Sequence, residues 1–257
     1  MNDAHKAFLQ AFMSVGVQKA KEVKEVYRKC CEQCAEPYSN EEKERTRQMV
    51  EFIRTINNCI QPFHLEVKKG VCEEDGTHFY CLVNNVENAF TLLASDYTAN
   101  DLEFFKKLVE EIISSDGCVG SRVALNVVER LEKKMTRQDA EILLERLEND
   151  RWVLMKEGVV SLSVRSILEL NQYIQQVYPD FVKNCNICKL ICLKGQACDE
   201  CGVKIHNHCA TRYFRDQDRC PDPDCSAVWT RPAPENDEAG HEPTQDRATR
   251  RRRRDDE

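Results

Sequence analysis

Apolar positions in the first part of the chain repeat with two periods. Apolar side chains three or four residues apart predict helices within residues 8–15, 19–34 and 49–60. The spacing then changes, because apolar residues alternate at 63–67 and again at 79–83, as they do in strands. Glu74-Asp75-Gly76 lies between the two runs and is a turn signal. This part is therefore predicted to form three helices and a β-hairpin.

The same order of elements recurs in the next part of the chain. Helices and strands are predicted at residues 102–112, 123–131, 140–147, 152–154, 159–160 and 167–177. Thr136 and Asp139 have the spacing of a capping box, in which the hydroxyl accepts a free N–H of the helix that follows. Glu157-Gly158 is the expected hairpin turn. Three helices and a two-stranded wing describe a winged-helix domain, here present twice.

The chain is predicted to be mainly α with small β-hairpins. Its C-terminal segment has almost no apolar residue larger than Ala and cannot bury enough surface to offset the entropy of ordering it. We therefore expect tandem winged-helix domains, a cysteine-rich finger and a disordered polar tail. The predicted boundaries are 1–98 for the first winged helix, 99–182 for the second, 183–230 for the finger and 231–257 for the tail.

The second winged helix does not have the charge pattern of a DNA reader. Its third helix, at about 137–149, would be the one to enter a groove. The acidic residues of this helix are Asp139, Glu141, Glu145 and Glu148, against Arg137 and Arg146. Because a phosphate backbone favours Lys and Arg, we expect a helix that docks protein and direct DNA binding that is weak at most.

Composition favours a globular protein and argues against a membrane protein, a secreted protein and a protein that binds nucleic acid through overall charge. The chain has 257 residues, 41% of them hydrophobic and 32% charged, which is typical of a globular protein with more than one core. No apolar run approaches the roughly 18 residues of a membrane span, so no membrane association is expected. The N-terminus lacks the features of a secretory signal, so disulfides are not expected either. The net charge of −7 argues against nucleic-acid binding through overall charge.

Cysteine is the residue that carries the functional argument. The chain has 15, and eight of them fall within residues 185–225. Seven of these eight and one histidine make four closely spaced pairs of metal-ligand type. The pairs are Cys185 and Cys188, Cys198 and Cys201, His206 and Cys209, and Cys220 and Cys225. Two residues between cysteines let the backbone form a knuckle that places both sulfurs on one metal ion.

Eight ligands predict two zinc ions. Zinc takes four Cys or His ligands tetrahedrally, and a module of fewer than about 50 residues usually needs metal to fold. With no ligand position left open, the zinc is expected to be structural. Alternation, with pairs one and three on one ion and pairs two and four on the other, is the cross-brace of a RING finger. The spacing alone does not decide between this and other pairings.

Two further residues within the finger could be metal ligands. His208 is two residues from His206 and is an alternative ligand, although the spacing to Cys209 favours His206. Cys192 stands outside the four pairs and is expected to pack as a small apolar side chain.

Three stretches of this sequence resemble a known family. They are VKKGVCEEDGTHFYCLVN at the first hairpin, RSILELNQYIQQVYPD before the finger, and CNIC…CDECGVKIHNHC within it. The likeness covers about residues 3–230. The chain resembles the RING-bearing, first non-SMC element subunit of the third eukaryotic SMC complex, the DNA-repair relative of cohesin and condensin.

The resemblance implies a function. Members have tandem winged helices and a variant RING with the same order of four Cys, one His and three Cys. It implies a RING-type ubiquitin-protein ligase acting in recombination and double-strand-break repair, on chromosomes in the nucleus. The winged helices would dock a MAGE-type subunit, which joins a kleisin-like subunit on the SMC heads. Ile187 and Pro221 match positions where RING ligases touch a ubiquitin-conjugating enzyme.

This sequence departs from the RING pattern at its last pair. Four residues, rather than the usual two, separate Cys220 from Cys225. Many active RINGs place Arg or Lys just after the last ligand, and Ser226 stands there in this chain. We therefore expect an intrinsic ligase activity that is weak without a partner.

Other functions compete with the ligase. The chain could be an architectural subunit whose winged helices and finger only bind protein. A histone-reading PHD finger has the same ligand order but expects a Trp at position 218, where this chain has Asp218. A covalent thioester ligase would need an activated thiol, and nothing near Cys192 or the 30–34 cysteine cluster is arranged for that. The Arg250–Arg254 run is either an import signal, a nucleic-acid tether or a solvated tail.

Overall fold

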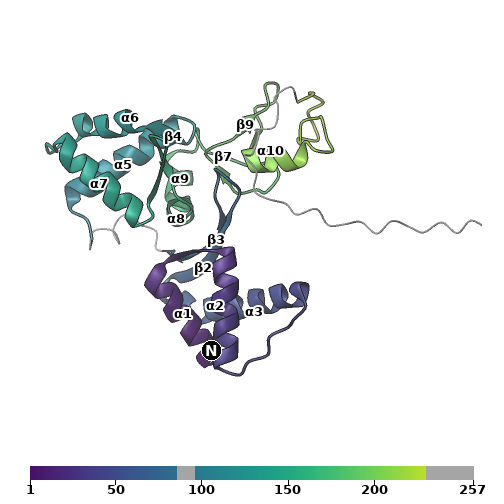
Figure 1. The fold of residues 1–257 in the computed structure, drawn as a ribbon. Coiled ribbons are helices and arrows are strands. Elements are labelled where there is room, and N and C mark those ends of the chain that lie inside the picture. Colours follow the sequence, from purple (N-terminus) through teal and green to yellow (C-terminus); the bar gives the residue numbers. More distant parts are fainter. Residues whose placement is uncertain (86–95, 230–257) are drawn as a thin grey trace, which may run out of the picture.

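The computed structural model describes residues 1–85 and 96–229 (Figure 1). Its first unit is a winged helix, as predicted. The elements are α1 (Asp3–Val15), β1 (Val17–Lys19), α2 (Ala20–Gln33), α3 (Glu42–Ile60), the 3-10 turn η1 (Gln61–Phe63), β2 (Leu65–Val71) and β3 (His78–Asn84). The strands form one antiparallel sheet in the order β1-β3-β2. In Figure 1 the hairpin of β2 and β3 rises from this unit towards the finger.

The first core joins the apolar faces of the three helices to the sheet. Phe8, Phe12 and Ile56 are fully buried in it, as the helical spacing requires. Two apolar residues at the ends of predicted segments are exposed instead. Val15 is 59% exposed at the last turn of α1, where Gly16 with φ +74° redirects the chain, and Phe63 is 71% exposed in η1 rather than in a strand.

The second unit repeats this plan. Its elements are α5 (Ala99–Ser114), β4 (Cys118–Gly120), α6 (Ser121–Asn126), the 3-10 turn η2 (Val127–Arg130), α7 (Arg137–Asn149), β5 (Val153–Lys156) and β6 (Val159–Leu162). The sheet order is β4-β6-β5. Tyr97, which the predicted boundary at residue 98 assigns to the first domain, already packs in this second core.

The local signals of the second unit act as predicted. The Asp139 N–H donates to the Thr136 hydroxyl at 3.1 Å, and the Thr136 N–H donates to the Asp139 carboxylate at 3.3 Å, which is a capping box. Glu157 and Gly158 both have positive φ, the geometry of a tight hairpin turn between β5 and β6.

The apolar pattern did not predict one short strand in each winged helix. Three-residue β1 and β4 are too brief to show an alternation, and each pairs with a strand some 40 to 60 positions later along the chain, such as Val17 opposite Cys81 and Val119 opposite Val160. Each wing is therefore completed to a three-stranded sheet by a contact that has no local signature.

The predicted closing helix is divided in two and joins the two winged helices. It forms α8 (Val164–Glu169) and α9 (Asn171–Val177), with the break at Leu170. Val164 of α8 packs with Cys81 and Val83 on the sheet of the first unit. The approach is close, since a Cβ added at Gly70 of β2 would lie 2.5 Å from a Val164 methyl group.

The finger lies beside both winged helices (Figure 1). Its elements are β7 (Lys183–Asn184), β8 (Ile191–Cys192), β9 (Gln196–Ala197), β10 (Lys204–Ile205) and α10 (Asn207–Tyr213), with β7 paired to β8 and β9 to β10. The side chains of Ile191 and Leu193, which belong to the finger, pack in the core of the second winged helix. The predicted tail at 231–257, with Arg250–Arg254, falls outside the described residues. Among the described helices, none is long and apolar enough to cross a membrane.

Candidate metal centre

Two knuckles present the first two cysteine pairs of the finger. After Cys185 the chain turns back, so that the Lys189 N–H donates to the Cys185 carbonyl at 2.8 Å. The second knuckle is built alike, with the Gly202 N–H donating to the Cys198 carbonyl at 2.9 Å. Lys189 and Gly202 each follow the second cysteine of their knuckle and each has positive φ. The repeated backbone turn aims both sulfurs of a knuckle to the same side.

The first group of four combines the first and third pairs. The ligand atoms of Cys185, Cys188, His206 and Cys209 all lie within 4.8 Å of one another. His206 occupies the position just before α10 and Cys209 lies in the first turn of that helix, so the helix sets their spacing. The Nδ1 atom of His206 is 3.3 Å from the sulfur of Cys188 and 4.0 Å from that of Cys209.

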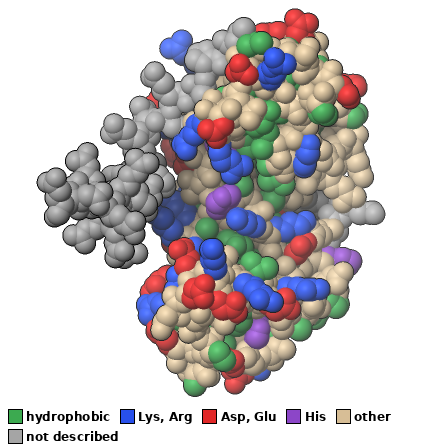
Figure 2. All heavy atoms as spheres, turned by 90° about the vertical axis from the view of Figure 1, so that its right-hand side faces the viewer, with side chains coloured by type: hydrophobic (Ala, Val, Ile, Leu, Met, Phe, Trp, Pro, Cys, Tyr) green, Lys and Arg blue, Asp and Glu red, His purple; other side chains and the backbone are tan. Residues whose placement is uncertain are grey.

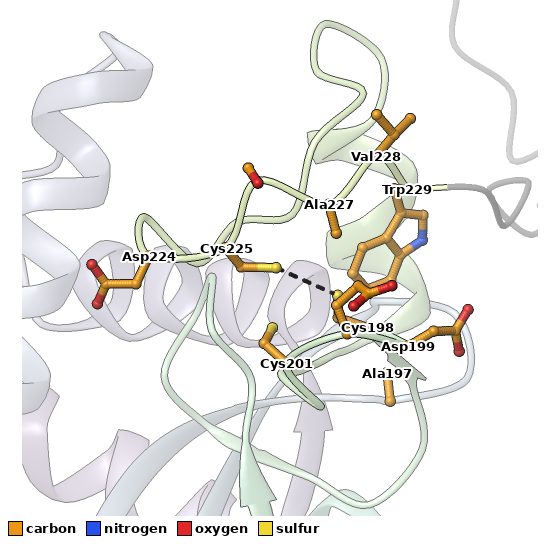
Figure 3. Close-up of a pocket in the computed structure, with 11 residues that line it drawn as sticks. Ala197, Cys198, Asp199, Cys201, Asp224, Cys225, Ala227, Val228 and Trp229 are labelled. Carbon is orange, nitrogen blue, oxygen red and sulfur yellow. Dashed lines mark hydrogen bonds between the residues drawn. The ribbon is translucent and has the colours of Figure 1, made fainter.

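The second group combines the second and fourth pairs, which are Cys198, Cys201, Cys220 and Cys225. The Cys198 and Cys225 sulfurs are 3.9 Å apart and face each other in Figure 3, with the Cys201 sulfur pointing towards them. The Cys201 and Cys220 sulfurs are 3.6 Å apart. The four residues between Cys220 and Cys225 make a tight turn, in which the Cys225 N–H donates to the Asp222 carbonyl at 3.1 Å. The longer spacing therefore still brings both sulfurs to the group.

Both groups have the dimensions of a tetrahedral zinc site. Ligands about 2.3 Å from zinc for sulfur and about 2.05 Å for nitrogen would stand about 3.8 Å apart for two sulfurs and about 3.5 Å for sulfur and nitrogen. The distances above scatter around these values. Zinc binds cysteine as the thiolate, so binding of an ion to either group would release protons from its thiols.

The structure decides between the two histidines. Nδ1 of His206 faces the sulfurs, whereas the ring of His208 stacks on the ring of His206 at 4.9 Å. Nδ1 of His208 is buried without a hydrogen-bond partner in the described structure, and burial lowers its pKa. His206 thus belongs to the group of four, while His208 fills space against the hairpin turn at Gly76.

The remaining cysteines discussed above are packing residues. Cys192 is fully buried, and its thiol donates to the Lys194 carbonyl at 3.2 Å. Cys30 and Cys31 lie in the first core. Burial raises the pKa of all three thiols, which opposes the thiolate form that a thioester ligase would need. His206 and Lys204 act in the opposite direction on Cys192, but burial outweighs them, which argues against the covalent ligase.

Glu73 lies beside the first group of four ligands, and the sequence pattern did not predict it there. Glu73, in the hairpin turn between β2 and β3, is 8% exposed and its carboxylate reaches His206. A glutamate in a turn is ordinarily a solvated residue, and more than a hundred positions separate it from the finger. Its only signal in the sequence is that it lies within the stretch at 67–84 that carried the family resemblance.

Known proteins resemble this chain over most of its length. Residues 5–129 match a family described as the Nse1 non-SMC component of the SMC5-6 complex, and residues 185–225 match a RING-like domain. A Non-structural maintenance of chromosomes element 1 homolog of Bos taurus is 38% identical over 91% of this chain and 87% of its own length. The homolog of Homo sapiens is 37% identical over 91% of this chain and 86% of its own.

The chain belongs to the Nse1 family. A solved chain described as the Nse1-Nse3-Nse4 complex has the same fold, with a TM-score of 0.78 and 36% identity over 90% of this chain and 98% of that one. The family resemblance and the fold class expected from the sequence are thereby confirmed.

The two residues of this Nse1-family finger that were expected to contact a ubiquitin-conjugating enzyme are half-buried. Ile187 packs against the small core of the finger, and Pro221 begins the turn after the seventh ligand. Trp229, after the last ligand, stacks on Phe214 and donates its ring N–H to Gln196. This tryptophan is therefore part of the finger's own core.

Proposed function

We propose that this chain is the RING-bearing subunit of an SMC5-6 complex and acts in recombination and double-strand-break repair, on chromosomes in the nucleus. Membership of the Nse1 family supports this, as does the fold shared with a chain of the Nse1-Nse3-Nse4 complex. The observation that carries it furthest is the pair of four-ligand groups, because their alternation along the chain is the RING cross-brace.

Two structural zinc ions are proposed for the finger, one in each group. All four donors of each ion come from the protein, so no position is left for a reacting water. Zinc supplies cross-links between knuckles that are otherwise held by few apolar contacts. The chemistry of the finger therefore lies in the surface that its knuckles present.

That surface is proposed to hold a ubiquitin-conjugating enzyme. A RING ligase has no nucleophile of its own and acts by positioning, since it holds the ubiquitin thioester where a substrate lysine can attack. Ile187, between the first two ligands, and Pro221, after the seventh, are the proposed contacts. Both lie at the finger's surface and are only half-buried, as contact residues need to be.

Ubiquitin discharge tests the ligase. The wild-type protein, loaded with zinc, is expected to speed the loss of ubiquitin from a charged conjugating enzyme, more so with a MAGE-type partner present. Ile187→Ala should lower this rate at least tenfold while leaving two zinc ions bound, because it removes the anchor without touching a ligand. Rates are read from the disappearance of the thioester on gels.

A matched control separates contact from general damage. Val177 in α9 is also an apolar side chain at the surface, 50% exposed, and lies outside the finger. Val177→Ala should discharge ubiquitin at the wild-type rate. Equal rates for wild type and Ile187→Ala would remove the assigned role of Ile187.

An architectural subunit is the second candidate. Two observations favour it: Ser226 is exposed where active RINGs carry a basic residue, and Ile187 is partly used by the finger's own core. In that case no mixture discharges ubiquitin although zinc is bound at two per chain, and the finger serves only as a binding module.

The winged helices are proposed to dock a MAGE-type subunit, with a kleisin-like subunit and the SMC heads beyond it. The complex named for the solved relative supports this, since it contains Nse3 and Nse4. Direct DNA binding is proposed to be weak at most. Arg137 of α7 pairs with Glu129, and Arg146 pairs with Asp150. On the face drawn in Figure 2, Lys and Arg side chains are interspersed with Asp and Glu.

A further inference from the structure

We propose that Glu73, on the wing of the first winged helix, is the carboxylate that orients the zinc ligand His206. The first metal site would then be completed by a residue from outside the finger. This inference rests on the zinc occupancy proposed above, and it assigns a positioning residue that the ligand pattern does not contain.

The two ring nitrogens of His206 have different partners. Nδ1 faces the sulfurs of the first group, and Nε2 lies on the opposite side of the ring. The Nε2–H donates to a carboxylate oxygen of Glu73 at 3.1 Å and to the Ile191 carbonyl at 2.8 Å. A metal-binding histidine ordinarily donates its second N–H in this way, which fixes the tautomer and ring orientation and makes the ligating nitrogen more basic.

Glu73 is held in place from the finger side as well. One carboxylate oxygen accepts the Leu193 N–H at 2.8 Å, and the other accepts the Lys194 N–H at 3.3 Å. With only 8% of its surface exposed, a carboxylate would be costly to bury without such partners. Three N–H groups of the finger thus converge on one side chain of the wing.

The rest of the turn is shaped to bring Glu73 this close. Gly76 has φ +71°, and a Cβ added there would lie 2.9 Å from the His208 side chain, so the turn approaches α10 more closely than another residue allows. Glu74 forms an ion pair with Lys194. No hydrogen bond or ion pair joins Glu74 to a proposed metal ligand in the described residues, so Glu74 is the matched control.

Substitution of Glu73 is expected to weaken the first zinc site selectively. Glu73→Gln keeps the size of the side chain and an oxygen that can accept from His206, but removes the charge. Loss of an outer carboxylate of this kind costs roughly 10- to 100-fold in metal affinity. Glu74→Gln removes a neighbouring charge on the same turn and should leave zinc binding unchanged.

Zinc release from the full chain tests the proposal. Protein with two bound zinc ions is mixed with a coloured chelator, and the two release phases are followed. In Glu73→Gln one phase should accelerate by roughly 10- to 100-fold and the other should stay at the wild-type rate, with Glu74→Gln like wild type throughout. Unchanged release in Glu73→Gln overturns the proposal, as does equal acceleration of both phases, which would indicate general loosening of the finger.

A spectroscopic readout separates orientation of His206 from mere packing. With cadmium-113 in place of zinc, a three-sulfur, one-nitrogen site and a four-sulfur site give separate signals. Glu73→Gln should shift only the signal of the site with nitrogen, and the signal of the four-sulfur site should not move. If Glu73→Gln does not fold, Glu73→Asp, which keeps the charge, is measured in the same way, and an unshifted signal there also counts against the proposal. Wild type that binds no zinc would instead overturn the proposed function.

Discussion

Cys192 shows how closely a cysteine can approach a proposed zinc group without being one of its four ligands. Its sulfur lies within 4.8 Å of ligand atoms of Glu73 and His206, but its thiol donates a hydrogen bond to the Lys194 carbonyl and it belongs to neither group of four. Cys185 is equally buried, and its sulfur faces Cys209 and His206. Burial and residue type are the same, so only the direction of the sulfur separates ligand from filler.

This difference predicts opposite results for two cysteine substitutions. Cys185→Ser removes a thiolate ligand of the first group and should leave about one zinc per chain, because hydroxyl is a poor zinc ligand. Cys192→Ala should keep both ions and cost only about 1 kcal/mol of stability from the small cavity. Zinc is counted by atomic absorption on the purified protein. Loss of an ion in Cys192→Ala would make Cys192 a ligand.

At the scale of elements, α7 is the helix that most separates this protein from a DNA-binding winged helix. Its inner face is filled by Ala140, Leu143, Leu144 and Leu147, as its spacing predicts. Its outer face is acidic and also carries Ile142, which is 59% exposed. An apolar residue among carboxylates suits a protein partner better than a phosphate backbone.

A charge placed on α7 should therefore weaken the complex with the MAGE-type subunit. Ile142→Asp is expected to reduce co-purification at least tenfold, since it would bury a carboxylate in the interface, and the far-UV spectrum should not change because Ile142 lies outside the core. Val228→Asp, at a residue 60% exposed on the finger, is the control. Equal recovery of partner by Ile142→Asp and wild type would place the interface elsewhere.

At the scale of the molecule, three modules pack as one unit. The first sheet receives Val164 of α8, and Ile191 and Leu193 of the finger enter the second core. The turn at Gly117 comes so close to Leu193 that an added Cβ would lie 2.7 Å from its backbone. A structural change in either winged helix would therefore reach the finger through direct contacts.

Close packing between the winged helices predicts an unequal pair of glycine substitutions. Gly70→Ala places a methyl group 2.5 Å from Val164 and should lower the free energy of unfolding by about 1–3 kcal/mol. Gly120→Ala adds the same group to strand β4, where nothing lies within 4 Å, and should change stability by less than about 0.5 kcal/mol. Urea unfolding monitored by circular dichroism measures both. Equal stabilities would mean that the two modules are not packed at Gly70.

The sequence by itself determined the features whose cause is local. Apolar spacing located the long helices and hairpins, Thr136 and Asp139 marked a helix start, and cysteines with two residues between them defined knuckles, because each signal lies within a few residues of the structure it forms. The tertiary structure decided what depends on contacts between distant residues: the pairing of β1 and β4, which ligand pairs come together, the position of His206 rather than His208 among the sulfurs, and the carboxylate of Glu73 at the finger. These contacts join positions tens to more than a hundred residues apart, and no local pattern specifies which of many compatible partners will meet.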